Sequence, residues 1–422
     1  MKSRKYFCQP LFKLLVVLLM LFVAFPSIGS VVPVTGFPLN KGHILFSENI
    51  QANLLNDTDI KSVIYKYFET KYESQRSLLK KEFSTLVYDN THDWVKQEND
   101  KRDIELYIAS KFDLKYINYY FELFIDQIIL SDDVATVYLY ESHDVVFEAS
   151  APEVSSLSGL RHIITLRETP TGWLIQEDQY EDELSKQLSF MTVSDIKSII
   201  DENHNKDLQI NNYSSGPSIN EGTRFLSNNP MLENKTYNGS DAASYADDHT
   251  SDLPGSSTYN TNWYKTEESD CANFVSQAIY AGEGKTPPDA SGMGNDYQTD
   301  WYYVFNNPMG NQNGSGSLAW IRVQEKFNFI TGNTNKIGPY GYLAMQGYST
   351  YCDIGIGGVV QLYDVNGNRI WDHEGIVVQI NDCWSMSQVL VDAHTTNRKH
   401  YPLSNWASFT WRGIHISGWR SN

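Results

Sequence analysis

Four polar side chains, distant in the chain, have the types and order that acyl-transfer chemistry at a thiol requires. Cys271 comes first, within the segment Asp270–Gln277. His373 follows at the start of a β-branched run, and Asp392 and His394 come in the next such run. A cysteine nucleophile needs an imidazole that takes its proton and a third group that fixes the imidazole tautomer. The pattern therefore predicts a cysteine, a histidine base and a polar orienting residue.

The residues around Cys271 predict that it lies in the first turn of a helix. Four apolar residues recur after it at helical spacing, namely Phe274, Val275, Ala278 and Ile279. Gly282 stands where the helix would stop, and Asp270 is a favourable N-cap type. The positive end of a helix dipole and a nearby imidazolium stabilise a thiolate. The backbone amide of Cys271 would be a natural oxyanion donor.

The third group has two candidates. In an extended strand Asp392 and His394 point to the same face, because side chains alternate with a period of two. Either could approach the second ring nitrogen of His373. Asp392 could instead cap a turn or pair with Arg398.

Zinc is the main chemical alternative to a thiol mechanism. Six zinc-compatible residues cluster in the same region: Asp372, His373, Glu374, Asp392, His394 and His400. However, the sequence has no His-Glu-x-x-His motif and no paired-cysteine spacing. We therefore expect no metal and no other cofactor.

The first thirty residues predict export. The basic residues Lys2, Arg4, Lys5 and Lys13 precede the apolar run 14–25, and small residues follow at 27–30. This is the pattern of a secretory signal peptide, cleaved near residue 30, although an uncleaved anchor stays open. The run is short for a permanent membrane span, and no later stretch is long and apolar enough. We expect a secreted or cell-wall-associated protein.

Charge and composition exclude some partners. The net charge is −18, and loss of the four basic residues of the signal segment would make it −22. Such acidity opposes binding to nucleic acid and simple charge-driven adhesion to an anionic wall. With 27 tyrosines and 10 tryptophans, the chain is not a disordered acidic tail.

The cysteine count predicts one disulfide. Of four cysteines, Cys8 would leave with the signal segment, so an odd number remains in an oxidising compartment. The simplest solution pairs Cys352 with Cys383 and leaves Cys271 free. Three free thiols are the alternative.

Residues 31–205 predict a smaller α+β domain. A helix is expected from Asp59, a second at 103–111 and a last one from Ser194 to near Asn203. Strands are expected between them at 116–129, 134–140, 145–149, 162–167 and 173–180, with a hairpin turn at 170–172. Helices followed by an antiparallel meander resemble the NTF2-like domains by element order alone.

Residues 206–235 have the Asn, Ser, Gly and Pro content of a linker. Residues 236–422 then predict a second α+β domain, with a helix at 240–249, the cysteine helix and a loop-rich stretch at 284–351. Strands are expected at 358–364, 370–380, 388–395 and 411–417, and Asn366-Gly367 predicts a hairpin between the first two. Helix first and sheet second is the element order of the papain-like fold.

Several separated motifs in this second domain resemble the NlpC/P60 and CHAP superfamily of cell-wall cysteine hydrolases. They are Asp270-Cys271-x-x-Phe274-Val275, Gly358–Leu362, His373-x-Gly375–Val378 and Val391–His394. The closer resemblance is to the amidase domain family of exported proteins of Bacillus and its relatives, through Asp270–Gln277, Trp301–Tyr303, His373, Ala393–Thr395 and the ending at 402–416. Two features depart from the superfamily: Gly357-Gly358 replaces the usual Gly-Asp, and the chain between the cysteine helix and that strand is longer.

The resemblance implies a papain-like, NlpC/P60-type thiol hydrolase of amide bonds, with peptidoglycan as the expected substrate. It implies Cys271 as nucleophile and His373 as base, and it favours His394 over Asp392 as the third residue. The candidate substrate-binding residues are Asp270, Asn273, Gln277, Trp301 and Tyr302. We expect Asn273 and Gln277 to support the site by hydrogen bonds, and Trp301–Tyr303 to form core or groove wall. A thiol acyltransferase and a non-catalytic wall or spore-surface binding protein are the alternatives.

Overall fold

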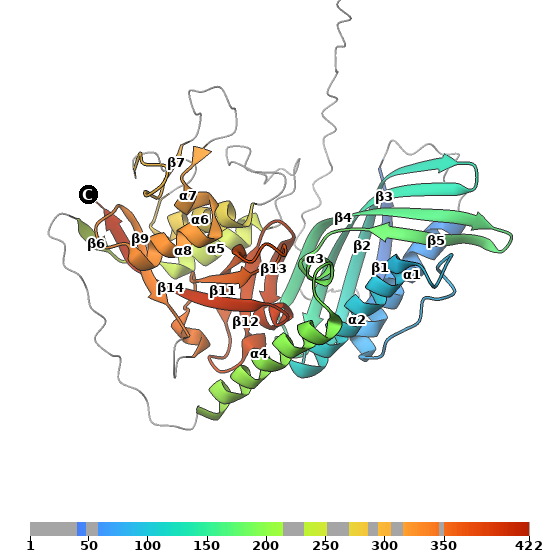
Figure 1. Cartoon of the computed structure of the whole chain (residues 1–422), viewed down its shortest axis with the longest axis horizontal. Coiled ribbons are helices and arrows are strands. Elements are labelled where there is room, and N and C mark those ends of the chain that lie inside the picture. The colour runs from blue at the N-terminus through green and yellow to red at the C-terminus, as the bar shows by residue number, and fades with distance from the viewer. Residues whose placement is uncertain are drawn as a thin grey trace, which may run out of the picture.

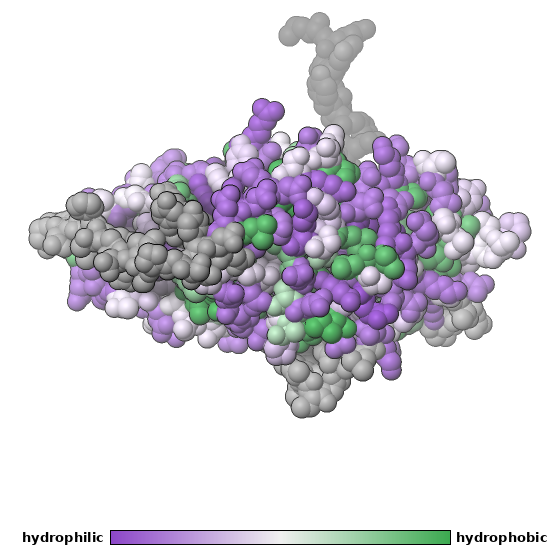
Figure 2. Space-filling model, turned by 90° about the horizontal axis from the view of Figure 1, so that it is seen from below, coloured by the Kyte–Doolittle hydropathy of each residue, from purple (hydrophilic) through white to green (hydrophobic). Residues whose placement is uncertain are grey.

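The computed structural model describes residues 40–47, 58–213, 232–250, 270–285, 294–304, 315–345 and 350–421. The predicted signal peptide and much of the predicted linker, residues 214–231, lie outside these ranges. Within the described part of the chain, no helix is long and apolar enough to cross a membrane. Figure 2 shows a mostly hydrophilic face with small, separated apolar areas.

The N-terminal part packs helices against a strongly curved meander. Its elements are β1 (Lys41–Phe46), α1 (Thr58–Ser77), α2 (Asp93–Lys111), β2 (Tyr116–Ser131), β3 (Val134–Phe147), β4 (Val154–Thr169), β5 (Gly172–Gln179), α3 (Glu183–Leu188) and α4 (Val193–Tyr213). Strand β2 alternates buried and partly buried residues from Tyr119 to Ile125, so that Tyr119, Phe121 and Leu123 share one face. These side chains form one core with the apolar stripe of α1, which includes Ile64 and Phe68.

The C-terminal part places helices on one face of an antiparallel sheet (Figure 1). Its helices are α5 (Gly239–His249), α6 (Cys271–Gly282), α7 (Leu318–Ile321) and α8 (Val323–Gly332), with short 3₁₀ turns η4 (Tyr351–Asp353), η5 (Met386–Gln388) and η6 (Leu403–Trp406). Its strands are β6 (Glu233–Lys235), β7 (Tyr303–Val304), β8 (Ser315–Gly316), β9 (Gly338–Leu343), β10 (Val359–Tyr363), β11 (Trp371–Ile380), β12 (Val389–Ala393), β13 (Asn397–Pro402) and β14 (Thr410–Ser421).

A single mixed sheet runs through both parts. Its order is β1-β2-β3-β4-β13-β12-β11-β10-β14-β6, with β5 added to β4 and β9 to β14, and β1 parallel to β2. The junction is the antiparallel pair β4–β13, in which Arg398 lies opposite Leu157. Figure 1 shows these strands side by side at the centre of the molecule. The expected mixed α+β class is confirmed, whereas the joining of the two parts into one sheet was not predicted.

Some predicted boundaries were wrong. Helix α4 continues to Tyr213, ten residues beyond the predicted end at Asn203 and into the predicted linker. The strands expected at 134–140 and 145–149 are one strand, β3, with a register shift near Glu141. The stretch 284–351 contains α7, α8 and β7–β9 instead of loop alone. The extended part of α4 packs on the C-terminal part, where Asp207 accepts hydrogen bonds from the Tyr351 hydroxyl and the Met386 amide.

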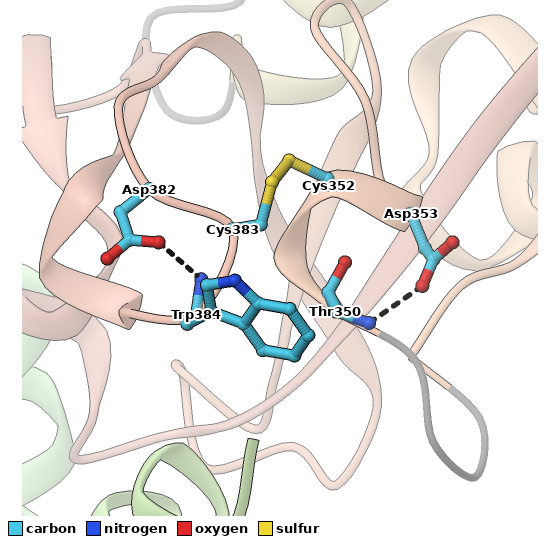
Figure 3. The surroundings of a disulfide bond; sticks show 6 residues. All are labelled: Thr350, Cys352, Asp353, Asp382, Cys383 and Trp384. Carbon is cyan, nitrogen blue, oxygen red and sulfur yellow. Dashed lines mark hydrogen bonds between the residues drawn. A yellow bond between two sulfur atoms is a disulfide. The ribbon is translucent and has the colours of Figure 1, made fainter. Parts of the chain in front are cut away.

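The disulfide between Cys352 and Cys383 is present, as the cysteine count predicted (Figure 3). It joins η4 to the turn after β11. Beside it, the Tyr351 amide donates to the Cys383 carbonyl oxygen at 3.0 Å. The Thr350 amide donates to Asp353 at 2.7 Å, and the Trp384 amide donates to Asp382 at 3.0 Å. Both ends of the crosslink are therefore held by local hydrogen bonds.

Candidate active site

Cys271 is the first residue of α6, as predicted, and is 3% exposed. Its Sγ lies 3.9 Å from the backbone carbonyl oxygen of Asp372 at the start of β11. The thiol packs in a small cluster with Ala272, Val323 and Trp371. It is the one cysteine of the described residues outside the disulfide.

Asp270 stands at the N-cap position but does not cap the helix with its side chain. Its carboxylate instead accepts a hydrogen bond from Nδ2 of Asn273 at 3.0 Å and lies 2.9 Å from Nδ1 of His394. The ring of His394 stacks on Phe274, with centroids 3.9 Å apart, and its Nε2 lies 3.0 Å from the His249 carbonyl oxygen. These contacts tie the start of α6 to the turn after β12.

His373 lies on the opposite face of β11 from the cysteine helix. Leu362 pairs with His373 and Gln361 with Glu374, so the two consecutive side chains point to opposite sides of the sheet. The His373 ring packs edge-on against Trp406, with centroids 5.4 Å apart, and its Nε2 lies 3.7 Å from Oε1 of Glu183. The structure therefore places the predicted base beside η6 and α3, and does not bring it to Cys271.

Glu374 occupies the thiol-facing position instead. Its carboxylate forms a fully buried ion pair with Lys326 of α8, whose Nζ also donates to the Ala272 carbonyl oxygen at 2.5 Å. Gln361 donates to Glu374 at 2.7 Å and accepts from Nε of Arg412 at 2.8 Å. From the sequence, Glu374 is a candidate only for a zinc ligand. Because consecutive side chains of a strand point to opposite faces, the sequence could have shown that only one of His373 and Glu374 faces the cysteine helix.

Burial sets the protonation of the thiol and the imidazole. Removal from water raises the pKa of Cys271 to about 12, and the charge of Glu374 raises it further than Lys326 lowers it. Burial also lowers the pKa of His373, although Glu183 opposes this shift. In this state both groups are neutral near pH 7, so they do not form a thiolate–imidazolium pair.

Asp392 and His394 share a face of the sheet, but this is the α5 side and not the His373 side. Asp392 is fully buried, and Thr250 lies 2.8 Å from its Oδ2. The His400 amide donates to its Oδ1 at 2.7 Å. Neither candidate for the orienting role contacts His373 among the described interactions.

One group of described residues has the types and spacing to suit a cation. Ligand atoms of Asp247, Asp392 and His400 lie within 4.8 Å of one another. They already contact each other, since Nε2 of His400 lies 2.7 Å from Oδ1 of Asp247. The other zinc-compatible residues considered from the sequence, Asp372, His373, Glu374 and His394, are not members of this group.

The remaining candidates are supporting residues or core. Asn273 accepts a hydrogen bond from Nε1 of Trp320 at 2.8 Å, and Gln277 accepts one from Tyr245 at 2.7 Å. Trp301 is fully buried and packs against Trp320 and Trp419, whereas Tyr302 is only partly buried. Trp301 therefore lies in the core and offers no face to a sugar.

Comparison with protein families suggests an activity for this region. Residues 236–417 match the family described as "Putative amidase domain". The match supports assignment of this segment to that amidase family and suggests amide hydrolysis. It contains Cys271, His373, Asp392 and His394, and it leaves out residues 1–235. No curated protein and no solved structure matches the chain.

Proposed function

We propose that residues 236–422 form an exported amide hydrolase that acts on peptidoglycan, with Cys271 as its nucleophile. The observation that carries the proposal is the amidase-family match, within which a thiol outside the disulfide begins a buried helix. A helix N-terminus lowers the free energy of a thiolate and offers backbone amides to an oxyanion. Wall amides are proposed from the resemblance of the motifs to cell-wall hydrolases.

The reaction would proceed through a thioester. The Cys271 proton passes to the base, the sulfur attacks the amide carbonyl carbon, and the base returns the proton to the departing amine as the C–N bond breaks. Water, deprotonated by the same base, then attacks the thioester carbonyl and releases the acid and the thiol. Neither formation nor hydrolysis of the thioester needs an oxidant, a metal or a cofactor.

Catalysis by His373 requires its side chain to change face. Leu362 pairs with His373 while the next residue, Tyr363, pairs with Trp371, so Asp372 is the extra residue of a β-bulge. The Sγ of Cys271 already lies against the carbonyl of this residue. Because a shift of one residue reverses the side-chain faces, moving the bulge would turn His373 towards the thiol. We propose that substrate binding stabilises that arrangement, with His394 as the third residue and Asp392 as its alternative.

The proposal also assigns a role to each segment of the chain. Residues 1–30 would be a cleaved signal peptide, residues 31–205 an NTF2-like domain that positions the enzyme, 206–235 a connection, and 236–422 a papain-like domain.

One specific observation favours a second function. The Cys271 thiol is buried, has a raised pKa and touches no imidazole among the described contacts. These are the properties of a structural thiol. A non-catalytic wall-binding protein on an amidase-like scaffold would have such a thiol. A thiol acyltransferase would use the same residues as the hydrolase and differ only in the acceptor.

Product analysis separates these functions. The mature chain is incubated with purified peptidoglycan, with and without an added primary amine, and the products are identified by mass spectrometry. The hydrolase releases free amino and carboxyl groups, and the acyltransferase gives amide products with the added amine. Cys271→Ser keeps the side-chain size and should abolish turnover, whereas Lys399→Ala, which alters an unrelated partly exposed side chain, should not. Turnover that is unchanged in Cys271→Ser would overturn the proposed mechanism, and no turnover in the wild type would favour the binding protein.

A further inference from the structure

Arg412 of β14 lies on the same face of the sheet as the helix that carries Cys271. Strand pairing places Arg412 opposite Gln361, and Gln361 opposite Glu374. Paired residues on neighbouring strands point to one face of a sheet. Because Glu374 faces the start of α6, Arg412 also points to the side of the sheet that carries the thiol.

Two aromatic rings pack on the guanidinium of Arg412. Its Cζ lies 3.6 Å from the centre of the Phe327 ring and 4.0 Å from the centre of the Trp371 ring. Trp371 also packs against the buried cluster that contains Cys271. Arg412 and the thiol are therefore linked through a single side chain. Stacking on aromatic faces holds a guanidinium in place and leaves the N–H groups at its edge able to bind.

The hydrogen bonds of this guanidinium are incomplete. Nε donates to Oε1 of Gln361 at 2.8 Å, and Nη2 donates to Oε1 of Gln324 at 3.3 Å. Gln361 is itself fixed, because its Nε2 donates to the Val323 carbonyl oxygen at 2.8 Å and to Glu374 at 2.7 Å. Nη1 of Arg412 has no partner among the described residues and remains accessible to water. A charged donor is therefore available beside the thiol cluster.

Arg412 also lacks a counter-ion. Both of its acceptors are neutral amide oxygens, and it forms no ion pair within the described part of the chain. Burial lowers the pKa of Arg412 to about 10, and the charge of Glu374, which is already paired with Lys326, opposes this shift. The guanidinium stays charged at pH 7. A carboxylate would supply the missing negative charge and matches the planar guanidinium edge.

We propose that Arg412 binds a free carboxylate of the substrate close to the scissile amide, so that the enzyme selects peptides with such a carboxylate. Nη1 donates to a carboxylate oxygen, and Phe327 and Trp371 keep the guanidinium in position. This inference rests on the proposed function, because Cys271 defines where the amide lies. A phosphate could bind the same edge, but a carboxylate is favoured since the proposed substrate is a peptide.

Binding of N-acetylated stem peptides from purified peptidoglycan to the full mature chain tests the proposal. The Cys271→Ala variant is used, so that no turnover occurs. The peptides are compared with their carboxylates free and after conversion of the carboxylates to methylamides. The free peptides should bind with a dissociation constant below about 1 mM, and the methylamides at least tenfold more weakly. Equal affinity of the two forms, or no binding of either, overturns the proposal. Inorganic phosphate that binds more tightly than the peptides overturns the choice of a carboxylate.

Two further variants test the assignment to Arg412. Gln324→Glu places a carboxylate against Nη2, at the second residue of α8 where an acid suits the helix dipole. It should weaken binding of the free peptides at least tenfold and leave the methylamides unaffected. Arg412→Lys keeps the charge without the planar edge and should lower the preference for free peptides severalfold. Arg369→Gln, which removes an exposed cation between β10 and β11, is the matched control and should keep the full preference.

The preference is a ratio of two affinities in one variant, so a general loss of folding does not imitate its loss. An unchanged preference in both Gln324→Glu and Arg412→Lys overturns the role of Arg412. The proposed hydrolase is judged separately by the loss of turnover in Cys271→Ser. Turnover that depends on Cys271, together with equal binding of the two peptide forms, would leave the hydrolase standing and remove the carboxylate site.

Discussion

His373 and Glu374 are consecutive in the chain, yet only Glu374 faces the helix that carries Cys271. The ring of His373 contacts Trp406 and lies 3.7 Å from Glu183, while the carboxylate of Glu374 pairs with Lys326 next to the start of α6. This arrangement determines how the thiol, the imidazole and the buried ion pair should respond to mutation and pH.

In the free protein, the Cys271 thiol should be poorly ionised and should react slowly with an alkylating reagent. Because burial raises its pKa to about 12, alkylation at pH 7 should be far slower than for an ordinary thiol, whose pKa is about 8.5. His373→Ala should leave the rate unchanged, since the imidazole lies on the other face. The rate is measured by peptide mass mapping across pH 5–11. Fast labelling below pH 7 that His373→Ala abolishes would contradict the described arrangement of the free protein.

Removal of Lys326 should strongly destabilise the C-terminal part. Lys326→Met leaves the carboxylate of Glu374 buried without its cation, and breaking a buried pair in this way costs about 3–5 kcal/mol. The double variant Lys326→Met/Glu374→Gln should recover part of that loss, because the uncompensated charge is gone. Denaturant unfolding of both variants measures the difference. A loss below about 1 kcal/mol for Lys326→Met would show that the pair is not buried as described.

His162 should make stability depend on pH in the alkaline range. It is fully buried between Asp178, at 2.9 Å, and Glu141, at 3.1 Å, and these acids raise its pKa to about 9 despite the cost of desolvation. A raised folded pKa stabilises the native state fully below about 6.5, and this stabilisation is lost as pH rises towards 9. The loss amounts to about 3 kcal/mol.

The test compares wild type with His162→Gln from pH 6 to 9.5. The glutamine variant should be less stable at pH 6 and should lack most of the slope. His43→Gln, at an exposed position, is the control and should follow wild type. An equal slope in wild type and His162→Gln would disprove the role of this imidazole.

The main elements could be predicted from local pattern, because long apolar alternations and a clear hairpin turn dominate their sequences. The helix that starts at Cys271 and the strands β10 and β11 around Asn366-Gly367 are examples. The pairing of β13 with β4 could not be predicted, since Asn397–Pro402 is polar and lacks alternation. The face of His373 follows from its regular pairing with Leu362, and strand alternation shows only that His373 and Glu374 face opposite sides, not which side the cysteine helix covers.

Asp392 should produce a second pH dependence, in the acid range. Burial and the nearby Asp247 raise its pKa to about 7, and its Oδ2 lies 2.8 Å from the Thr250 hydroxyl, which donates to the Ala246 carbonyl oxygen at 2.5 Å. A protonated Asp392 can therefore donate to Thr250. Because the native state binds this proton more tightly than the unfolded chain does, stability should fall as pH rises from about 4 to 7.

Asp392→Asn keeps the shape of the side chain and a donor for Thr250, and it removes the proton. The variant should lose the fall in stability between about pH 4 and 7 and should be more stable than wild type at pH 8. Urea unfolding at pH 4, 6 and 8 measures the slope, with Asp353→Asn beside the disulfide as a carboxylate control on another element. A variant that is less stable than wild type at pH 8 would show that the ionised Asp392 carboxylate is favourably paired in the folded protein, and would overturn the raised pKa.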